Sequence, residues 1–416
     1  MSSTTITTGT PLRQDAGVIG LVGIAHLISH YSQLLLAPLF PFLKTEFNVG
    51  YAELGFLMTI FFVVSCAVQA GSGFVVDRFG ARPILFGGLA LLGVAALGFA
   101  ASTSYAMLAL FSVVAGVGNG VFHPVDYTLL NRKVSGARLG HAYSVHGITG
   151  SLGWALAPAM LVPLAIAFSW RVALVAAAVL AFAVLAVLLV FRERLALPPA
   201  HRAAPGGAAA AAQQGSAFGF LAIPSVWMCF AFFFVYAAVL SVVQTFAPSA
   251  AGYLHDVPTS LVAMCLTIFM VASACGMVLG GFLAADPSRC ERVVAVGFAI
   301  AAVMALALGF MQMPGTLVPV LFAVMGFGSG IAGPSRDLLV KRSTPENATG
   351  RVYGVVYSGL DIGQAVTPLL FGWMMDHGQF RSVWLGLALL QGLLIASAFN
   401  VRRVRRTALP VGGAPA

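Results

Sequence analysis

The chain of 416 residues is 59% hydrophobic, and only 8% of its residues are charged. Soluble domains carry about 25% charged residues because water must solvate their surface, so this composition excludes a soluble enzyme. Apolar runs of about 20 residues, the length that crosses a bilayer, recur from end to end. The net charge of +9 does not indicate a nucleic-acid partner, because the cations lie in the connections between these runs.

Apolar runs separated by Gly, Pro and charged residues predict twelve transmembrane helices, so the expected fold is an all-α membrane protein. The runs are continuously apolar, whereas barrel strands alternate apolar and polar residues. The five cysteines form no CxxC pair, and we expect no disulfide, no metal centre and no cofactor. The predicted spans lie at 17–43, 52–76, 83–101, 105–130, 139–164, 171–191, 218–247, 259–284, 293–312, 317–340, 349–374 and 380–401.

The distribution of cations predicts the orientation in the membrane. All but three of the 22 Lys and Arg residues fall at the N-terminus, at the even-numbered connections or at the C-terminus; the exceptions are Lys44, Arg171 and Arg381. Cytoplasmic segments of membrane proteins are enriched in Lys and Arg. Both termini are therefore expected in the cytoplasm, as an even number of spans requires, and the expected location is a bacterial-type cytoplasmic (inner) membrane.

The chain is expected to divide into two bundles joined by a linker. Residues 192–216 are rich in Pro, Ala, Gly and Gln, a composition that buries too little apolar surface to fold. The predicted division is an N-terminal six-helix bundle over 1–191, a cytoplasmic linker over 192–216, a C-terminal six-helix bundle over 217–401 and a basic cytoplasmic tail over 402–416.

The two predicted bundles are related in sequence. Residues of the fourth and fifth spans recur without a gap 210 positions later; among them Gly116, Gly118, Gly120 and Pro124 have identical counterparts at Gly326, Gly328, Gly330 and Pro334. Residues 59–65 match residues 267–273 at an offset of 208. Such a parallel repeat is typical of transporters built from two equivalent bundles around a central site.

The connection after the second span carries the motif Gly73-Phe-Val-Val-Asp77-Arg78-Phe-Gly80-Ala-Arg82. We expect Gly73 to allow close packing of two helices, and Gly80 to form a tight turn. The motif resembles the G-x-x-x-D-R-x-G-x-R loop of the major facilitator superfamily. The resemblance implies a major facilitator fold of two pseudo-symmetric six-helix bundles, transport by alternating access, and a charged latch that breaks and re-forms between the halves.

A narrower resemblance lies in the fourth span, where Val121-Phe122-His123-Pro124 is similar to a segment of the fosmidomycin-resistance group of facilitator exporters. Two positions differ from that group. In that group an acidic residue directly follows His-Pro, whereas this chain has Val125 there and Asp126 one position later. The acidic residue of the group's first span is replaced by His30. The resemblance favours export of a small organic molecule, but the coupling chemistry and the substrate of that group are not carried over.

Few ionisable residues lie within the predicted spans, and three of them are candidates for proton coupling: Asp361, His30 and Asp126. Asp361 lies near the middle of the eleventh span, where a charge costs several kcal/mol, so it is expected to face a cavity or to be protonated. The alternative is a neutral, hydrogen-bonded acid that only holds helices together.

Asp126 and Arg336 occupy equivalent positions of the repeat, since they are 210 residues apart. Both lie about one turn from the cytoplasmic ends of their spans. Opposite charges at equivalent positions predict a gate in which the two side chains pair across the halves. The alternative is that each pairs within its own half, for instance Arg336 with Asp337.

His26 and His30 are four residues apart and therefore lie on one face of the first helix. Contact with substrate or with neighbouring helices is the first interpretation, a proton relay is the second, and a transition-metal site completed by His123 or Asp126 is the last. The residues expected to line the substrate cavity are His26, His30, His123, His146, Tyr236, Gln244 and Gln364.

These patterns predict a monomeric secondary transporter rather than an enzyme, with a small organic molecule, protons and the lipid bilayer as its partners. The sequence has no GxxxxGK[ST] loop for a nucleotide, so the expected energy source is the proton gradient, and the expected process is efflux by antiport, as in multidrug export. Proton-coupled uptake of a monocarboxylate or similar organic anion, and transition-metal transport, are the alternatives. The connections are too short for a receptor or membrane enzyme.

Overall fold

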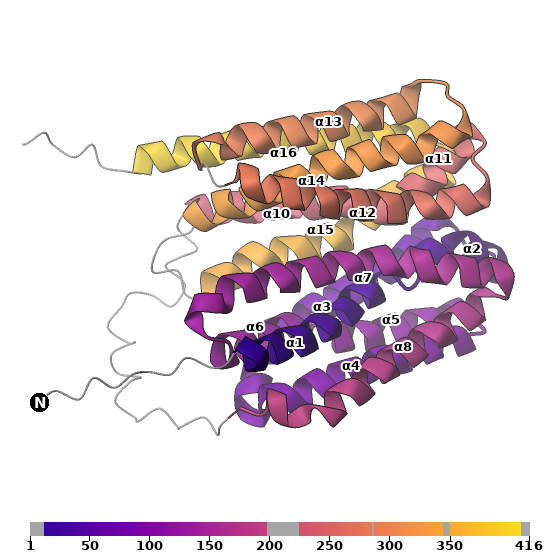
Figure 1. The fold of residues 1–416 in the computed structure, drawn as a ribbon. Coiled ribbons are helices and arrows are strands. Elements are labelled where there is room, and N and C mark those ends of the chain that lie inside the picture. Colours follow the sequence, from indigo (N-terminus) through magenta and orange to yellow (C-terminus); the bar gives the residue numbers. More distant parts are fainter. Residues whose placement is uncertain (1–11, 198–223, 285–286, 344–349, 409–416) are drawn as a thin grey trace, which may run out of the picture.

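The computed structural model describes residues 12–197, 224–284, 287–343 and 350–408, and this part of the chain forms helices and no strand. Figure 1 shows the N-terminal helices, in indigo to magenta, on one side of the bundle and the C-terminal helices, in orange to yellow, on the other. One end of the bundle carries the start of α1 and the end of α16, and we name it the terminal end. The opposite end carries two short helices and is named the α2–α11 end.

The N-terminal half follows the predicted spans, with breaks in two of them. Pro38 and Pro41 lack the amide hydrogen that a continuing helix needs, so the first span is split. The fourth span is split at Gly120 and Val121, just before Pro124. The elements are α1 (Leu12–Gln33), η1 (Ala37–Leu39), α2 (Phe40–Phe47), α3 (Tyr51–Phe79), α4 (Ala81–Ala101), α5 (Tyr105–Asn119), α6 (Phe122–Lys133), η2 (Gly136–Arg138), α7 (Leu139–Ala167), α8 (Trp170–Val190) and η3 (Arg192–Leu195).

The C-terminal half repeats this order of long helices. Its last helix continues through Ala408, seven residues past the predicted end of the final span, while the predicted linker beyond residue 197 and the tail beyond 408 lie outside the described residues. The elements are α10 (Pro224–Thr245), α11 (Ala247–His255), α12 (Thr259–Leu283), η5 (Pro287–Arg289), α13 (Cys290–Phe310), η6 (Gly315–Leu317), α14 (Val318–Ser343), α15 (Gly350–Asp376) and α16 (Phe380–Ala408).

These helices are long and apolar enough to cross a bilayer. In the described part of the chain, 11 segments meet both conditions, with α1 and α2 forming one segment and α5 and α6 another. The helix α15, with 27 residues, is the twelfth long helix and contacts both α3 and α10. Each of the twelve predicted spans therefore coincides with a long helix or with a split pair.

The sequence repeat corresponds to one packing contact that is made twice. A Cβ atom on Gly116 of α5 would lie 2.7 Å from the carbonyl oxygen of Phe61 in α3, and Gly326 of α14 lies against the carbonyl of Phe269 in α12 in the same way. Small residues allow two helix backbones to approach this closely. The contact recurs one turn further on, between Gly120 and Ser65 and between Gly330 and Ser273.

The two halves touch at the α2–α11 end. Asp376, the last residue of α15, accepts hydrogen bonds from the amides of Tyr51 and Ala52 at 2.6 and 2.8 Å. It thereby satisfies amide hydrogens at the start of α3 that have no partner within that helix. Further into the bundle, the hydroxyl of Thr59 in α3 donates to the carbonyl oxygen of Ala365 in α15 at 2.5 Å. The contact between α3 and α15 therefore closes this end.

Candidate functional site

Five polar side chains of the N-terminal half meet between α1, α6 and α7, and we name this group the histidine cluster. Its members are His26, His30, His123, His146 and Asp126. Asp126 is fully buried, and His26 and His146 are 2% and 6% exposed. His30 and His123 are only half-buried. The cluster therefore joins a buried carboxylate to imidazole rings that approach the surface of the half.

One oxygen of Asp126 connects three helices. Its Oδ2 atom lies 3.0 Å from Nδ1 of His26 in α1 and 3.1 Å from Nε2 of His146 in α7. The two imidazole rings stack with their centroids 3.5 Å apart. Each ring nitrogen donates to the carboxylate when it carries the proton. The second oxygen, Oδ1, is buried and has no hydrogen-bond partner among the described residues.

Glycines of α7 bring this helix close enough to α1 for the rings to meet. A Cβ atom on Gly150 would lie 2.8 Å from Nδ1 of His30 and 3.1 Å from Nε2 of His26, and Gly153 lies against the backbone of α1. The close contact between α7 and α1 is made at these two positions. It does not extend to Gly147, where a Cβ atom would meet nothing within 4 Å.

The polar groups that surround the cluster were not predicted from the sequence. The hydroxyl of Ser29 donates to Oδ1 of Asn119 at 2.7 Å, and Nδ2 of Asn119 donates to the hydroxyl of Ser65 at 2.9 Å. Trp154 lies beside His30, with ring centroids 4.3 Å apart. A lone amide such as Asn119 in an apolar span is the signal that points to this network, because polar groups within a membrane are costly unless partnered.

In the C-terminal half, the predicted residues form two separate contacts. Asp361 accepts a hydrogen bond from Nε2 of Gln69 in α3 at 3.1 Å, so this acid lies at the contact between the halves. Gln364 donates to Oε1 of Gln244 at 3.2 Å, and both amides are buried. The sequence analysis did not identify Gln69, which belongs to the other half of the chain.

The predicted gate pair is not formed in this structure. The carboxylate of Asp126 is engaged by His26 and His146, and its other oxygen has no partner among the described residues. The guanidinium of Arg336 lies over the ring of Tyr236 in its own half, with Cζ 4.0 Å from the centroid. Pairing across the halves stays a prediction for a conformation in which the terminal end is closed.

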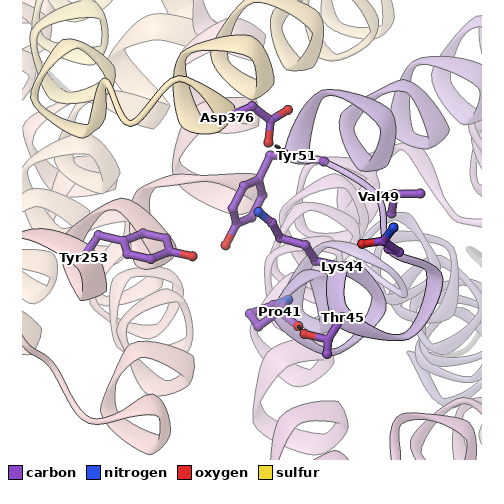
Figure 2. Close-up of a pocket in the computed structure, with 9 residues that line it drawn as sticks. Pro41, Lys44, Thr45, Val49, Tyr51, Tyr253 and Asp376 are labelled. Atoms are coloured by element: carbon purple, nitrogen blue, oxygen red, sulfur yellow. Dashed lines mark hydrogen bonds between the residues drawn. The ribbon is translucent and has the colours of Figure 1, made fainter.

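A cavity of about 630 Å³ lies at the α2–α11 end, between the two halves (Figure 2). The ammonium of Lys44 lies 4.9 Å from the centroid of the Tyr51 ring on one wall, and Tyr253 lies opposite. A smaller cavity of about 40 Å³, lined in part by Gln244 and Pro158, lies between α7, α10 and α12. The residues around the larger cavity are Pro41, Lys44, Thr45, Asn48, Val49, Gly50, Tyr51, Tyr253 and Asp376.

Comparison with known families identifies the fold. The model of the Major Facilitator Superfamily matches residues 22–357 and, in a second match, residues 260–414. The chain belongs to the Major Facilitator Superfamily. Proteins of this superfamily are membrane transporters of small molecules rather than enzymes, and they work as single chains.

Individual relatives within the superfamily are distant. The fosmidomycin resistance protein of Escherichia coli is 28% identical over 156 residues, 36% of each chain. The multidrug resistance protein B homolog of Mycobacterium tuberculosis is 29% identical over 164 residues. The chain therefore aligns with only 36% of the length of the first relative and 30% of the length of the second. The probable nitrate/nitrite transporter NarK2 of Mycobacterium tuberculosis is 25% identical over 88% of this chain and 90% of its own length.

A solved structure has the same fold. It is the crystal structure of a bacterial homologue of the human lysosomal transporter Spinster, in an inward-facing and unoccupied conformation. The TM-score is 0.75 over 98% of this chain and 100% of that chain, at 16% sequence identity. This similarity supports the major facilitator fold of two six-helix bundles that the loop motif and the repeat predict.

The facilitator loop itself is partly as predicted. Gly80 separates α3 from α4 with a φ of 86°, a left-handed conformation that favours glycine, so the predicted turn is confirmed. The predicted packing role of Gly73 is wrong, because a Cβ atom at this position would meet nothing within 4 Å. Gly73 is exposed in this structure.

The charged residues of the facilitator loop lie at the terminal end. Nη1 of Arg82 lies 3.5 Å from Oε1 of Glu193 in η3 and 3.4 Å from the carbonyl oxygen of Arg192. Arg78 is exposed and lies near the ring of Phe79. The side chain of Asp77 lies outside the part of the chain that the structure describes. Arg82 therefore attaches the loop to the segment that follows α8, within the N-terminal half.

Proposed function

We propose that this protein is a proton-coupled secondary transporter that exports a small organic molecule across the cytoplasmic membrane by alternating access. The observation that carries the proposal is a carboxylate within a membrane-spanning helix of each half that is held by polar side chains of other helices. Asp126 is held by two imidazoles, and Asp361 is held by the amide of Gln69. Acidic residues and histidines within transmembrane segments mark proton pathways in transporters.

The contact between Asp361 and Gln69 links protonation to the arrangement of the halves. An ionised carboxylate accepts a hydrogen bond from the amide N–H, whereas a protonated one donates its O–H to an acceptor. Because the two residues belong to α15 and α3, the change of hydrogen-bond direction occurs at the surface along which the halves move. A proton bound or released at Asp361 therefore favours one arrangement of α3 and α15 over the other.

In the N-terminal half, the histidine cluster provides a route for protons to Asp126. Histidine titrates near neutral pH and both accepts and donates protons. The half-buried rings of His30 and His123 lie beside the buried ring of His26, which contacts the carboxylate directly. A proton is thus passed from the more accessible rings to Asp126 without crossing apolar side chains.

Two relatives support export. The matched regions of the fosmidomycin resistance protein and of the multidrug resistance protein B homolog belong to proteins whose names describe resistance to drugs. Resistance by a facilitator fits outward movement of an organic molecule. No Arg or Lys lies in the histidine cluster, so the site favours a substrate without a permanent double negative charge.

Uptake of a small monoanion, such as a monocarboxylate, is the second candidate function. The observation that favours it is the alignment with the probable nitrate/nitrite transporter NarK2, which covers 88% of this chain. In that case the imidazoles of the cluster would bind the anion when protonated. The two functions differ in the direction of the proton gradient that drives accumulation of the substrate in vesicles.

The proposal is tested in proteoliposomes, after a screen of organic molecules for those that raise the unfolding temperature of the purified protein. Imposing pH gradients of either sign then shows which direction drives transport of each hit. Asp361→Asn and Asp126→Asn are expected to lower substrate-dependent proton flux to the rate of protein-free vesicles. The exposed acid Glu46, which pairs with Arg171 at the α2–α11 end, provides the control, Glu46→Gln, which should leave the flux unchanged. Normal flux in both aspartate variants would refute the proposal.

A further inference from the structure

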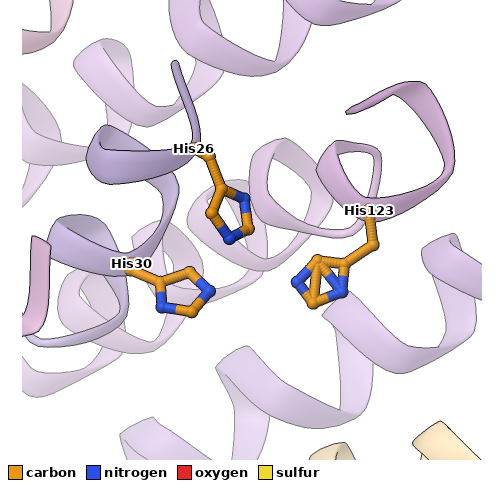
Figure 3. A group of neighbouring side chains, drawn as sticks. All are labelled: His26, His30 and His123. Carbon is orange, nitrogen blue, oxygen red and sulfur yellow. The ribbon is translucent and has the colours of Figure 1, made fainter. Parts of the chain in front are cut away.

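Three rings of the histidine cluster face a common centre. Figure 3 shows His26, His30 and His123 arranged around one space, each with a ring nitrogen directed toward it. One donor atom from each of the three lies within 4.8 Å of the other two. We infer that these residues form a binding site for a divalent transition-metal ion in the N-terminal half. The site goes beyond the proposed function: an ion held here would occupy the ring nitrogens that otherwise relay protons to Asp126, so the rings serve proton transfer only when no ion is bound.

The carboxylate of Asp126 orients His26 as a metal ligand. Because Nδ1 of His26 lies 3.0 Å from Oδ2 of Asp126, the proton of the ring belongs on Nδ1, and Nε2 keeps its lone pair. Metal-binding histidines almost always donate their other ring N–H to a carboxylate, a carbonyl or a water molecule. His146 holds the same carboxylate oxygen from α7. This arrangement is the one expected around a metal ligand, and substrate packing alone does not require it.

The space between the rings is kept open by a glycine. A Cβ atom on Gly150 would lie 3.1 Å from Nε2 of His26 and 2.8 Å from Nδ1 of His30, so any side chain at this position would occupy the volume beside these nitrogens. Nδ1 of His30 is buried and has no hydrogen-bond partner among the described residues. A polar atom in this situation is costly unless a ligand or water satisfies it.

The donor set selects the class of ion. Neutral imidazoles suit Zn²⁺, Ni²⁺, Co²⁺ and Cu²⁺, whereas Mg²⁺ and Ca²⁺ prefer oxygen ligands. Zinc–nitrogen bonds of about 2.0–2.1 Å place the donors of a tetrahedral site about 3.3 Å apart. The donors lie within 4.8 Å of one another here, so binding an ion requires the three rings to move closer together. Three imidazoles leave a fourth position of such an ion for water or for another oxygen donor.

A second group of three residues, His26, Asp126 and His146, is also close enough to hold an ion. Its donor atoms are already committed to one another, because Oδ2 of Asp126 lies within hydrogen-bond distance of both rings. The group around His30 and His123 is also the more accessible one, since both rings are half-buried. We therefore place the ion between His26, His30 and His123, with Asp126 and His146 as positioning residues.

The test is metal binding by the full-length protein, purified without a histidine tag and treated with a chelator. Titration with Co²⁺ should give the visible absorption of a tetrahedral site with nitrogen ligands, with one ion bound per chain, and Zn²⁺ should displace it. His30→Ala and His123→Ala should abolish this signal. Asp126→Asn should weaken binding by about 10–100-fold, as expected for loss of a group that orients a ligand. The measurement needs no transport activity, so its failure is distinct from failure of the proposed function.

Two matched controls separate the site from nonspecific binding. His255 is also a buried histidine, but it lies in the C-terminal half, where its Nε2 is hydrogen-bonded to the carbonyl oxygen of Leu308. The His255→Ala variant should therefore bind the ion normally. Gly150→Ala should block the site without removing a ligand, whereas Gly147→Ala, where a Cβ atom has open space, should not. Each variant is scored after size-exclusion chromatography shows that it is folded and monodisperse.

Three outcomes would overturn the assignment. The first is a folded wild-type protein that gives no tetrahedral Co²⁺ absorption. The second is undiminished binding in both His30→Ala and His123→Ala. The third is binding that is lost in His146→Ala but kept in His30→Ala, which would place the ion between His26, Asp126 and His146.

Discussion

The two halves share one scaffold but differ in what they bury. Gly153 lies against the carbonyl of Leu27 and the Cβ atom of His30 in α1, and Gly363 lies against the carbonyl of Phe234 and the Cβ atom of Ala237 in α10. Leu27 and Phe234 are 207 residues apart, as are His30 and Ala237, and this offset aligns α1 with α10. With this offset for α1 and the offset of 210 for the fourth and fifth spans, the counterparts of His26, His30, His123 and His146 are Phe233, Ala237, Gly333 and Val356.

The difference extends to the charges and to the backbone. Asp126 is held by imidazoles, whereas its counterpart Arg336 lies over the ring of Tyr236. The fourth span, which contains His123, is broken just before Pro124, while its counterpart α14 runs continuously through Pro334. The comparison shows that glycine packing fixes the bundle in both halves, whereas the buried cluster of imidazoles around a carboxylate lies in the N-terminal half, with aromatic and apolar residues at the equivalent histidine positions of the C-terminal half.

The largest effect is expected where the halves are alike. Gly116→Val and Gly326→Val would each force a side chain against a backbone carbonyl of the neighbouring helix, and overpacking of this kind costs about 1–3 kcal/mol or more. Both variants should therefore lower the unfolding temperature of the protein in detergent by similar amounts. Gly73→Ala and Gly281→Ala, which are equivalent positions with open space, should leave it unchanged. A clear difference between the two valine variants would break the equivalence of the scaffolds.

A smaller effect is expected where the halves differ. His146→Val installs the residue of the other half and removes one of the two imidazoles that hold the buried Asp126. Loss of a partner for a buried polar group costs about 1–3 kcal/mol. In a double-mutant cycle with Asp126→Leu, measured by unfolding, the two changes should show a coupling energy of about 0.5–3 kcal/mol. The distant pair His255→Val and Asp126→Leu should be additive, and additivity in the first cycle would show that the His146 contact contributes nothing.

The smallest effect is expected where the halves meet. Asp376→Ala removes the side chain that caps α3 from the other half, and loss of a helix cap costs about 0.5–2 kcal/mol, which corresponds to an increase of about two- to thirty-fold in the population open at the α2–α11 end. Labelling of a cysteine introduced at Thr45, beside the cavity, should accelerate by this factor. Glu53→Ala is the matched control, because Glu53 binds the amide of Gly50 at the start of the same helix without bridging the halves. Equal acceleration by Glu53→Ala would contradict the bridging role of Asp376.

The long helices were predictable because the length and hydropathy of each run determine whether it crosses a bilayer. Their breaks were not, since Gly120 was identified only as a position of the internal repeat, whereas in the structure it serves both packing against α3 and the turn before Pro124. The positions of Asp361 and Asp126 within the spans also followed from the sequence. Their partners did not, because the contacts with Gln69 and His26 join residues 292 and 100 positions apart. Such contacts depend on how the helices pack.

The shared oxygen of Asp126 has a consequence for communication within the molecule. His146 lies on α7, and further along the same helix Pro158 and Val162 line the small cavity together with Val262 of α12, in the other half. At 1.5 Å per residue, about 18 Å of helix separates His146 from Pro158. The helix that supplies one of the two imidazoles for Asp126 therefore also borders the opposite half, about three turns further along.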